Sequence, residues 1–305
     1  MSSTWVHWEM RSQNIEKVKV NSMEIRPSIR LVKNEIIQKY QNFRIDTTEN
    51  PYYLVGRSRP CRILFILSHM RSGSSLLTHI LNSNPDIIGY GETHIQYTSE
   101  IDFKRLMLKV YWEAQEFRTL RDIKNLSMNQ KYILDKVLHN NKFADDEFLL
   151  SDNLYSIFLL REPRRSLASI ASLKPHLNEE QILNYYAGRL SMLEQYARLI
   201  DSKKRSLLIT YHQMIKQTDL VFEALQKFLE IGGGFSEDYQ LLKTTGMRHV
   251  GDHQGNINAG RIVRTPRPLE TQLSEDAEKK GRESFERCGA TLSHYCSTVD
   301  SLCGS

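Results

Sequence analysis

The sequence predicts an α/β protein with three layers, in which helices cover both faces of a central parallel β-sheet. Short apolar runs alternate with longer amphipathic segments from Cys61 onward, which is the pattern of parallel strands joined by helical crossovers. The run Ile63–Leu67 is apolar at every position, as in a strand buried on both faces. It leads through a loop that contains one glycine, residues 68–75, into helical spacing. This is a P-loop-like unit of strand, loop and helix.

The same patterns predict the other elements in chain order. Further strands are expected at Ile87–Tyr90, Tyr132–Leu134, Tyr155–Leu160 and Leu207–Thr210. Amphipathic spacing predicts helices at Leu31–Tyr40, Ser74–Leu81, Asn178–Asp201, Leu220–Ile231 and from about Glu275 onward. The segment Gly246–Pro268 is rich in Gly, Asn, Arg and Pro and is expected to be a long loop. We therefore expect a partly helical lead-in over residues 1–60 and one domain over 61–305.

The composition limits the class of protein. The chain of 305 residues is 40% hydrophobic and 25% charged, as in ordinary globular proteins, and its net charge is +5. That charge suits a small polyanionic ligand, although a solvated basic face would give the same sum. The chain has no block of lysine and arginine and no nucleic-acid-binding motif, so nucleic acid is not an expected partner. The apolar runs are far shorter than the ~20 residues of a membrane helix, and residues 1–10 have no signal-peptide core. We expect a soluble cytoplasmic protein without a membrane span.

The four cysteines are expected to be partly buried free thiols. Cys288, Cys296 and Cys303 recur every seven or eight residues, and on a helix this places their sulfurs ~11–12 Å apart, too far for a disulfide. A zinc site that uses His294 is the alternative. The sequence contains no convincing metal-ligand cluster, so no metal is expected.

Polar residues follow several of the expected strands. The loop 68–75 follows the first strand, Glu92 follows the second, Asp135 and Lys136 follow the third, and Arg161 follows the fourth. Ligands of open parallel sheets bind outside the carboxyl ends of the strands. An anion-binding loop, a carboxylate, a lysine and an arginine are therefore expected together at the carboxyl edge of the sheet.

The loop residues Arg71, Ser72, Gly73, Ser74 and Ser75 have the chemistry of an anion site. Gly73 lets the backbone turn tightly and approach a ligand, and the first N–H groups of the following helix point at it. Ser74 and Ser75 add hydroxyl donors, and Arg71 adds a planar cation that suits an oxyanion. An ordinary helix N-cap on a plain turn is the alternative.

A triphosphate P-loop is the rival interpretation of this loop. That motif requires a second glycine and a lysine beside the serine, and both are absent here. The strand Tyr155–Leu160 ends in Arg161 and not in an aspartate for magnesium, which leaves Asp135 as the one aspartate placed to substitute. Binding of ATP with Mg²⁺ is therefore disfavoured.

These segments resemble the sulfotransferases that use 3′-phosphoadenosine 5′-phosphosulfate (PAPS). ILFILSHMRSGSSLLTHILNSNPDIIGYGET, residues 63–93, is similar to their 5′-phosphosulfate loop, and FLLREPRRSLAS, residues 158–169, to their 3′-phosphate signature. YILDKVLHN resembles their D-K-T-P-L-x-H segment with Val-Leu in place of Thr-Pro, and LLITYHQMIKQTDLVFEALQKFLEI resembles a late element. The matches cover about residues 60–240, and the motifs are closest to the tyrosylprotein and carbohydrate branches.

The resemblance implies a role for each matching residue. The loop Arg71–Ser75 would hold the 5′-phosphosulfate, with Arg71 also acting in catalysis. Lys136 would neutralise the bridging oxygen as the product adenosine 3′,5′-bisphosphate (PAP) leaves. Arg161 and Ser169 would hold the 3′-phosphate, with a salt bridge to the adjacent glutamate as the alternative for Arg161. No metal is required in this family.

The resemblance places a general base at Glu92. A carboxylate at a strand end beside a polyanionic donor is expected to have a raised pKa, which suits a base near neutral pH. His94 is the competing base and otherwise an acceptor contact. The loop His249–Asn256, with Arg261 and Arg264, lies where the family closes over the nucleotide, and a surface loop explains it equally well.

The expected function is sulfuryl transfer from PAPS to a hydroxyl or amine of a small-molecule acceptor, such as a natural product or alkaloid. A P-loop-type kinase or NTPase and a catalytically inactive anion-binding module are the alternatives. The acceptor wall is expected within residues 93–130 and the N-terminal segment, from the aromatic residues Tyr97, Phe103, Tyr111 and Trp112. Core packing explains these aromatics equally well.

Overall fold

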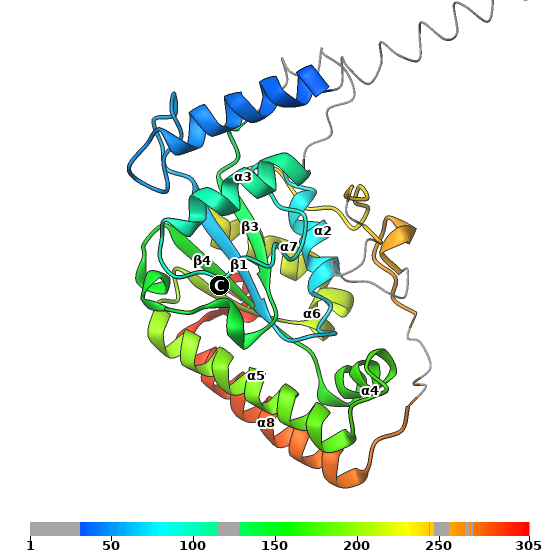
Figure 1. Ribbon diagram of the computed structural model, residues 1–305. Helices are drawn as coiled ribbons and strands as arrows, with labels where there is room; N and C mark the ends of the chain where they lie inside the picture. The colour runs from blue at the N-terminus through cyan, green and yellow to red at the C-terminus, as the bar shows by residue number, and fades with distance from the viewer. Residues whose placement is uncertain are drawn as a thin grey trace, which may run out of the picture.

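The computed structural model describes residues 31–114, 128–243, 245–246, 256–265, 269 and 271–304. A six-stranded sheet lies between helices, with the strand order β2-β3-β1-β4-β5-β6, and every neighbouring pair is parallel (Figure 1). The strands are β1 Arg62–Ser68, β2 Ile87–Ile88, β3 Tyr132–Val137, β4 Leu154–Leu160, β5 Ser206–Thr210 and β6 Ser297–Thr298. The predicted α/β class with a central parallel sheet is confirmed.

The helices follow the strands as crossover connections. They are α2 Ser74–Asn82, α3 Asp102–Ala114, α4 Pro163–Leu173, α5 Glu179–Ile200, α6 Tyr211–Lys216, α7 Thr218–Leu229, α8 Glu275–Tyr295 and α9 Val299–Cys303. Residues 31–46 are also helical, and short 3₁₀ turns lie at Asn140–Lys142, Glu147–Leu150 and Asn256–Ala259. The helices expected at 74–81, 178–201, 220–231 and from 275 onward are confirmed to within a few residues.

Two hydrophobic cores flank the sheet, and β1 contributes side chains to both of them. Ile63, Phe65 and Leu67 belong to the core under α3, α5 and α8, while Leu64 and Ile66 belong to the core under α2 and α7. Successive side chains of a strand point to opposite faces, so a strand covered on both faces must be apolar at every position. This is why the run 63–67 shows no polar alternation.

The third strand extends further than its apolar residues suggest. β3 pairs with β1 from Arg62↔Tyr132 to Leu67↔Val137, so Asp135 and Lys136 lie inside the strand and not beyond it. The expected end at Leu134 is wrong because backbone pairing with β1 continues through two buried charged residues. As neighbours in a strand, these two side chains point to opposite faces of the sheet. The expected strand 87–90 is, in contrast, shortened to Ile87–Ile88.

The helical lead-in packs on the body of the fold. Ile37 and Ile45 are fully buried, and the Gln41 side chain donates a hydrogen bond to the carbonyl of Tyr111 in α3, 3.2 Å away. The helix predicted near residues 31–40 is confirmed and runs on to residue 46. The domain boundary at residue 60 stays a prediction.

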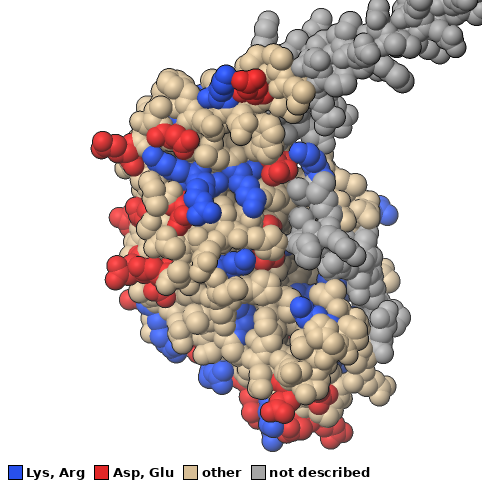
Figure 2. Space-filling model, in the orientation of Figure 1, with Lys and Arg blue, Asp and Glu red and all other residues tan. Residues whose placement is uncertain are grey.

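Positive charge occurs on the surface as well as in the interior of the site described below. Figure 2 shows a band of lysine and arginine side chains across the region where α3 lies in Figure 1, and Arg105 and Lys109 of that helix are exposed. The net charge of +5 is therefore not a measure of a ligand site alone. Across the residues that the structure describes, no helix combines the length and apolar character needed to cross a membrane.

Candidate active site

One cavity of about 990 Å³ opens where the carboxyl ends of β1, β3 and β4 meet. Ten side chains were predicted to form a site, and nine of them line this cavity: Arg71, Gly73, Ser74, Ser75, Glu92, His94, Lys136, Arg161 and Ser169. These residues come from segments up to about a hundred positions apart in the sequence. The predicted convergence of strand ends on one rim is what the structure shows.

The loop after β1 presents a helix N-terminus to the cavity. Gly73 is the N-cap of α2 with φ 94°, and no acidic residue lies in the first turn of the helix. A Cβ on Gly73 would lie 2.4 Å from a ring carbon of Tyr211, so only glycine fits between the loop and that ring. The N–H groups of the first turn have no acceptor within the helix, and such an end is chemically suited to an anion.

Ser72 differs from its neighbours in the loop. Its side chain is fully buried, does not line the cavity, and its Oγ has no hydrogen-bond partner in the structure. The Ser72 side chain is therefore kept out of the cavity, and the expected role of this residue in holding a ligand stays a prediction.

Arg71, Arg161 and Ser169 form a connected group. The Nε of Arg71 donates to Ser169 Oγ at 2.7 Å, and Nη1 of Arg161 donates to the carbonyl of Arg71 at 3.0 Å. The guanidinium of Arg161 also lies over the Tyr211 ring, 4.1 Å from its centre. Its nearest carboxylate contact, to Glu162, is 3.9 Å long, and Arg161 Nε is buried without a hydrogen-bond partner. The ion pair with Glu162, which was the alternative for Arg161, is therefore present in the structure at a long distance.

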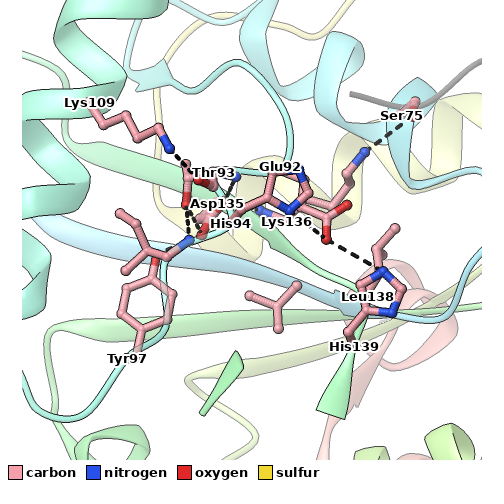
Figure 3. Close-up of polar contacts among 12 residues, drawn as sticks. Ser75, Glu92, Thr93, His94, Tyr97, Lys109, Asp135, Lys136, Leu138 and His139 are labelled. Atoms are coloured by element: carbon pink, nitrogen blue, oxygen red, sulfur yellow. Dashed lines mark hydrogen bonds and ion pairs between the residues drawn. The ribbon is translucent and has the colours of Figure 1, made fainter. Parts of the chain in front are cut away.

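Lys136 reaches the loop from β3. Its side chain is 2% exposed, and Nζ lies 3.3 Å from Ser75 Oγ (Figure 3). Burial lowers the pKa of Lys136, while the nearby carboxylates of Glu92 and Asp135 oppose that change. The loop and the lysine thus bring donors and a cation to one point of the cavity.

Glu92 is a buried carboxylate with an unused acceptor. It is 7% exposed, and its Oε1 is buried without a hydrogen-bond partner. That oxygen lies 3.6 Å from His94 Nδ1 and 3.8 Å from His139 Nε2 (Figure 3). Burial raises the pKa of Glu92, and the charge of Lys136 is the largest effect in the opposite direction. The carboxylate is placed to accept a proton from a group in the cavity.

His139 lines the cavity and was not among the predicted site residues. Burial is the main cause that lowers its pKa to about 4, so the ring is neutral at neutral pH and does not form an ion pair with Glu92. It is the histidine of the YILDKVLHN segment, which resembles the D-K-T-P-L-x-H segment of the family. His94 lies beside Glu92 as expected, with the positive backbone angle φ 59°.

Asp135 holds the loop that carries Glu92. Its carboxylate accepts hydrogen bonds from Thr93 N at 2.9 Å, Thr93 Oγ1 at 2.7 Å and Tyr97 OH at 2.6 Å (Figure 3). The Lys136 amide adds a fourth at 2.8 Å. Both oxygens are therefore engaged by the protein on the face of β3 opposite Lys136, so Asp135 is not placed as a magnesium ligand in the way that a triphosphate P-loop would require.

The aromatic residues expected to form an acceptor wall belong to the core. Tyr97, Phe103 and Tyr111 have no exposed surface, and Trp112 is half-buried and does not line the cavity. Tyr97, Phe103 and Phe65 pack with ring centres 5.2 to 6.2 Å apart. The wall prediction is wrong for Phe103 and Tyr111 because they lie on the buried face of α3, a helix that was not predicted. It is wrong for Tyr97 because that ring packs on Phe65 in the core.

A buried arginine that sequence reasoning missed ties the strand ends together. Arg189 of α5 is 1% exposed and donates to the carbonyls of Ser68 and Val137, each at 2.8 Å, and to Asn140 Oδ1 at 2.9 Å. These three acceptors are all neutral. It sits at an apolar-stripe position of a regular helix, where sequence alone gives no signal. Its role is to fix β1 and β3 where the cavity begins.

Further cations line the same cavity: Arg165, Lys174, Lys216, Arg261 and Arg264. Of the predicted closing segment, Arg261 and Arg264 therefore reach the site, whereas residues 249–255 lie outside the described part of the chain. Arg264 also pairs with Glu237. The excess of cations over the two lining carboxylates, Glu92 and Glu162, makes the cavity suitable for a polyanion.

The cysteines are free thiols. Cys61, Cys288 and Cys296 are buried, and burial raises the pKa of Cys61 to about 11, which leaves it protonated and unreactive. Within the described ranges no group of three or more His, Cys, Asp or Glu side chains could hold a metal ion, so the zinc alternative with His294 has no support there.

Comparison with known proteins finds a likeness at the level of structure. No protein-family model matches the sequence, and no curated protein matches it either. Among solved structures, the fold is similar to a sulfotransferase domain from the curacin biosynthetic pathway, with 16% sequence identity and a TM-score of 0.44. The match covers 78% of this chain and 99% of that domain. A likeness this distant does not assign an activity.

Proposed function

We propose that this chain is a PAPS-dependent sulfotransferase that transfers the sulfuryl group to a hydroxyl or amine of a small-molecule acceptor and releases PAP. The observation that carries the proposal is that three features meet in one basic cavity. They are the N-terminus of α2, the cations Lys136 and Arg161, and the buried carboxylate of Glu92, which has an unused acceptor oxygen. The motif resemblance described above supports the same assignment.

The donor would be held at both phosphate ends. The first turn of α2 with Ser74, Ser75 and Arg71 would bind the 5′-phosphosulfate. Arg161 and Ser169 would bind the 3′-phosphate, and the buried Nε of Arg161 supports this because it makes no hydrogen bond in the structure, which is rare for a buried donor. The residues present therefore fit a nucleotide with two phosphorylated positions.

Transfer forms a bond between the acceptor oxygen or nitrogen and sulfur, and it breaks the bond between sulfur and the bridging oxygen of the donor. Glu92 would take the acceptor proton. Lys136, beside Ser75, would neutralise the negative charge that develops on the bridging oxygen. As in phosphoryl transfer, positioning and charge stabilisation would supply most of the catalysis.

The strongest rival is a nucleotide kinase or NTPase. Such a site needs a carboxylate free to ligate magnesium, and Asp135, the candidate for that role, accepts four hydrogen bonds from the protein itself. An inactive anion-binding module is the other alternative. A module of that kind does not need a buried carboxylate with a raised pKa, such as Glu92, in its cavity.

Thermal-shift measurements in EDTA test the proposal directly. PAP is expected to raise the melting temperature without metal, whereas ATP, with or without Mg²⁺, is expected to leave it unchanged. Incubation with radiolabelled PAPS and a panel of hydroxyl and amine metabolites then tests transfer. Stabilisation by Mg²⁺ and ATP alone would instead support the kinase. Binding of PAP without transfer to any acceptor, and without slow hydrolysis of PAPS, would support the binding module.

A further inference from the structure

His69 is a fully buried histidine that the proposed chemistry does not use. It directly follows β1, has no exposed surface and does not line the cavity. Its ring packs edge-to-face on Tyr186 of α5, with 4.9 Å between ring centres. A histidine in such a place needs hydrogen-bond partners for both ring nitrogens.

Both ring nitrogens have partners that fix the tautomer. Nε2 lies 3.2 Å from the backbone N of Arg161, which can only donate, so Nε2 is the acceptor. Nδ1 lies 2.9 Å from the carbonyl of Met70 and therefore carries the proton. Burial lowers the pKa of His69 to about 4, which is consistent with a neutral ring at neutral pH.

His69 and Arg161 hold each other's segments. The His69 ring bonds the backbone of Arg161, and the Arg161 guanidinium returns to the backbone carbonyl of Arg71 at 3.0 Å. Tyr186 closes the arrangement, because its hydroxyl donates to the carbonyl of Arg161 at 2.8 Å. Arg161 is thus held by hydrogen bonds at its backbone amide, its backbone carbonyl and its side chain.

The hydrogen bonds of His69 and Tyr186 to Arg161 form a brace, which begins where the pairing of β1 with β4 ends. β1 and β4 pair up to Ser68↔Leu159, and beyond that point the two chains diverge into the Arg71–Ser75 loop and α4. The imidazole accepts a hydrogen bond from the amide of Arg161, the first residue after β4. The distance between the two segments expected to bind anions therefore depends on side-chain contacts as well as on strand pairing.

We propose that His69 is a positioning residue that sets Arg161 relative to the Arg71–Ser75 loop and thereby gives the site its selectivity for nucleotides that carry a 3′-phosphate as well as a 5′-phosphate. The inference rests on the proposed function, since it assumes that the loop holds one phosphate and Arg161 the other. A guanidinium displaced by less than 1 Å no longer makes two good bonds to a phosphate, so the selectivity depends on the brace.

Two isosteric substitutions separate the two contacts of the ring. The side-chain amide of His69→Gln reaches the position of Nε2 and can accept from the Arg161 amide. The amide of His69→Asn reaches only the position of Nδ1, so it keeps the Met70 contact and loses Arg161. Both substitutions are neutral and polar, and they differ mainly in which contact survives.

The measurement is the dissociation constant, by titration calorimetry, of PAP and of AMP, which lacks the 3′-phosphate. Wild type and His69→Gln are expected to prefer PAP over AMP by similar factors. His69→Asn is expected to reduce that preference about tenfold or more while AMP affinity changes less than about threefold, since the loop is retained. Equal preference in His69→Asn and wild type would overturn the proposal and leave His69 a packing residue.

Tyr186→Phe provides a second test should His69→Asn fail to fold. It keeps the ring against His69 and removes only the hydrogen bond to the Arg161 carbonyl, so a smaller loss of PAP preference is expected at nearly unchanged melting temperature. An unchanged preference there would contradict the brace. A wild-type protein that binds neither PAP nor AMP would contradict the proposed function itself, and the two failures are therefore distinguishable.

Discussion

The side chain of Arg71 donates a hydrogen bond to the hydroxyl of Ser169, 2.7 Å away, and so connects the loop after β1 to the helix after β4. The two residues are 98 positions apart in the sequence. The pair joins the segment expected to hold the 5′ end of the donor to the segment expected to hold its 3′-phosphate. Substitution of either member should therefore affect binding of both ends.

The first prediction concerns Ser169→Ala. The substitution removes one donor to the 3′-phosphate and releases Arg71, so PAP affinity should fall by about 10- to 100-fold, the range for a hydrogen bond to a charged group. Calorimetric titration measures it. Ser172→Ala, one turn further along α4 and also on the cavity wall, is the matched control and should change PAP affinity less than about threefold. Equal effects of the two substitutions would contradict the assignment of Ser169.

The second prediction concerns Glu92→Gln. As the proposed base, Glu92 should contribute ~10²–10⁴ to turnover, so the variant should lose that factor while PAP still binds. The variant should also melt at a higher temperature at pH 7. Because burial raises the folded-state pKa, the contribution of Glu92 to stability is present at low pH and is lost as the pH rises through that pKa. Full turnover in the variant would exclude Glu92 as the base.

The third prediction is the pH dependence of turnover. Glu92 must be ionised to accept a proton, so the acid limb of the kcat profile should lie above the ordinary glutamate pKa of 4.5. Removal of the nearby cation in Lys136→Gln should move this limb to still higher pH, in addition to slowing the reaction. His94→Gln distinguishes the rival base: the limb should persist in that variant, and its disappearance would assign the base to His94.

The fourth prediction concerns Gly73→Ala. Its Cβ would meet the Tyr211 ring at 2.4 Å, and φ 94° is strained for alanine, so the loop must shift and PAP binding should fall by at least tenfold. Gly188→Ala is the control, because no atom lies within 4 Å of its Cβ in α5. That substitution should stabilise the protein by up to ~1 kcal/mol, measured by urea unfolding, without any effect on PAP. Wild-type affinity in Gly73→Ala would show that the loop does not contact the nucleotide.

The fifth prediction concerns Arg189→Lys. A lysine cannot reach the three acceptors that the guanidinium fork satisfies, so the free energy of unfolding should fall by about 3 kcal/mol although the charge is kept. Arg198→Lys, a half-exposed position on the same helix, should change it by less than ~0.5 kcal/mol. Urea unfolding measures both. Equally small changes in the free energy of unfolding for both variants would mean that the buried guanidinium of Arg189 does not stabilise the strand ends.

Local pattern was sufficient for much of the fold. The uniformly apolar run 63–67 predicted a central strand because a strand covered on both faces has no polar side. The amphipathic spacing over residues 178–201 predicted a helix that the structure confirms from Glu179 to Ile200, with Asn178 as its N-cap. Pattern failed for α3 and for the end of β3, because partners distant in sequence decide where pairing stops and which aromatic residues are buried.

The sequence by itself determined the central strand, the anion loop and the residues that carry charge at the strand ends, since each depends on local composition and spacing. Only the tertiary structure decided how these residues meet. It directs Lys136 to the cavity and its neighbour Asp135 to the opposite face, buries the Ser72 side chain outside the cavity lining, and joins Arg71 to Ser169. The physical reason is that side-chain direction and long-range contact follow from strand register and helix packing, and these are fixed by the whole chain.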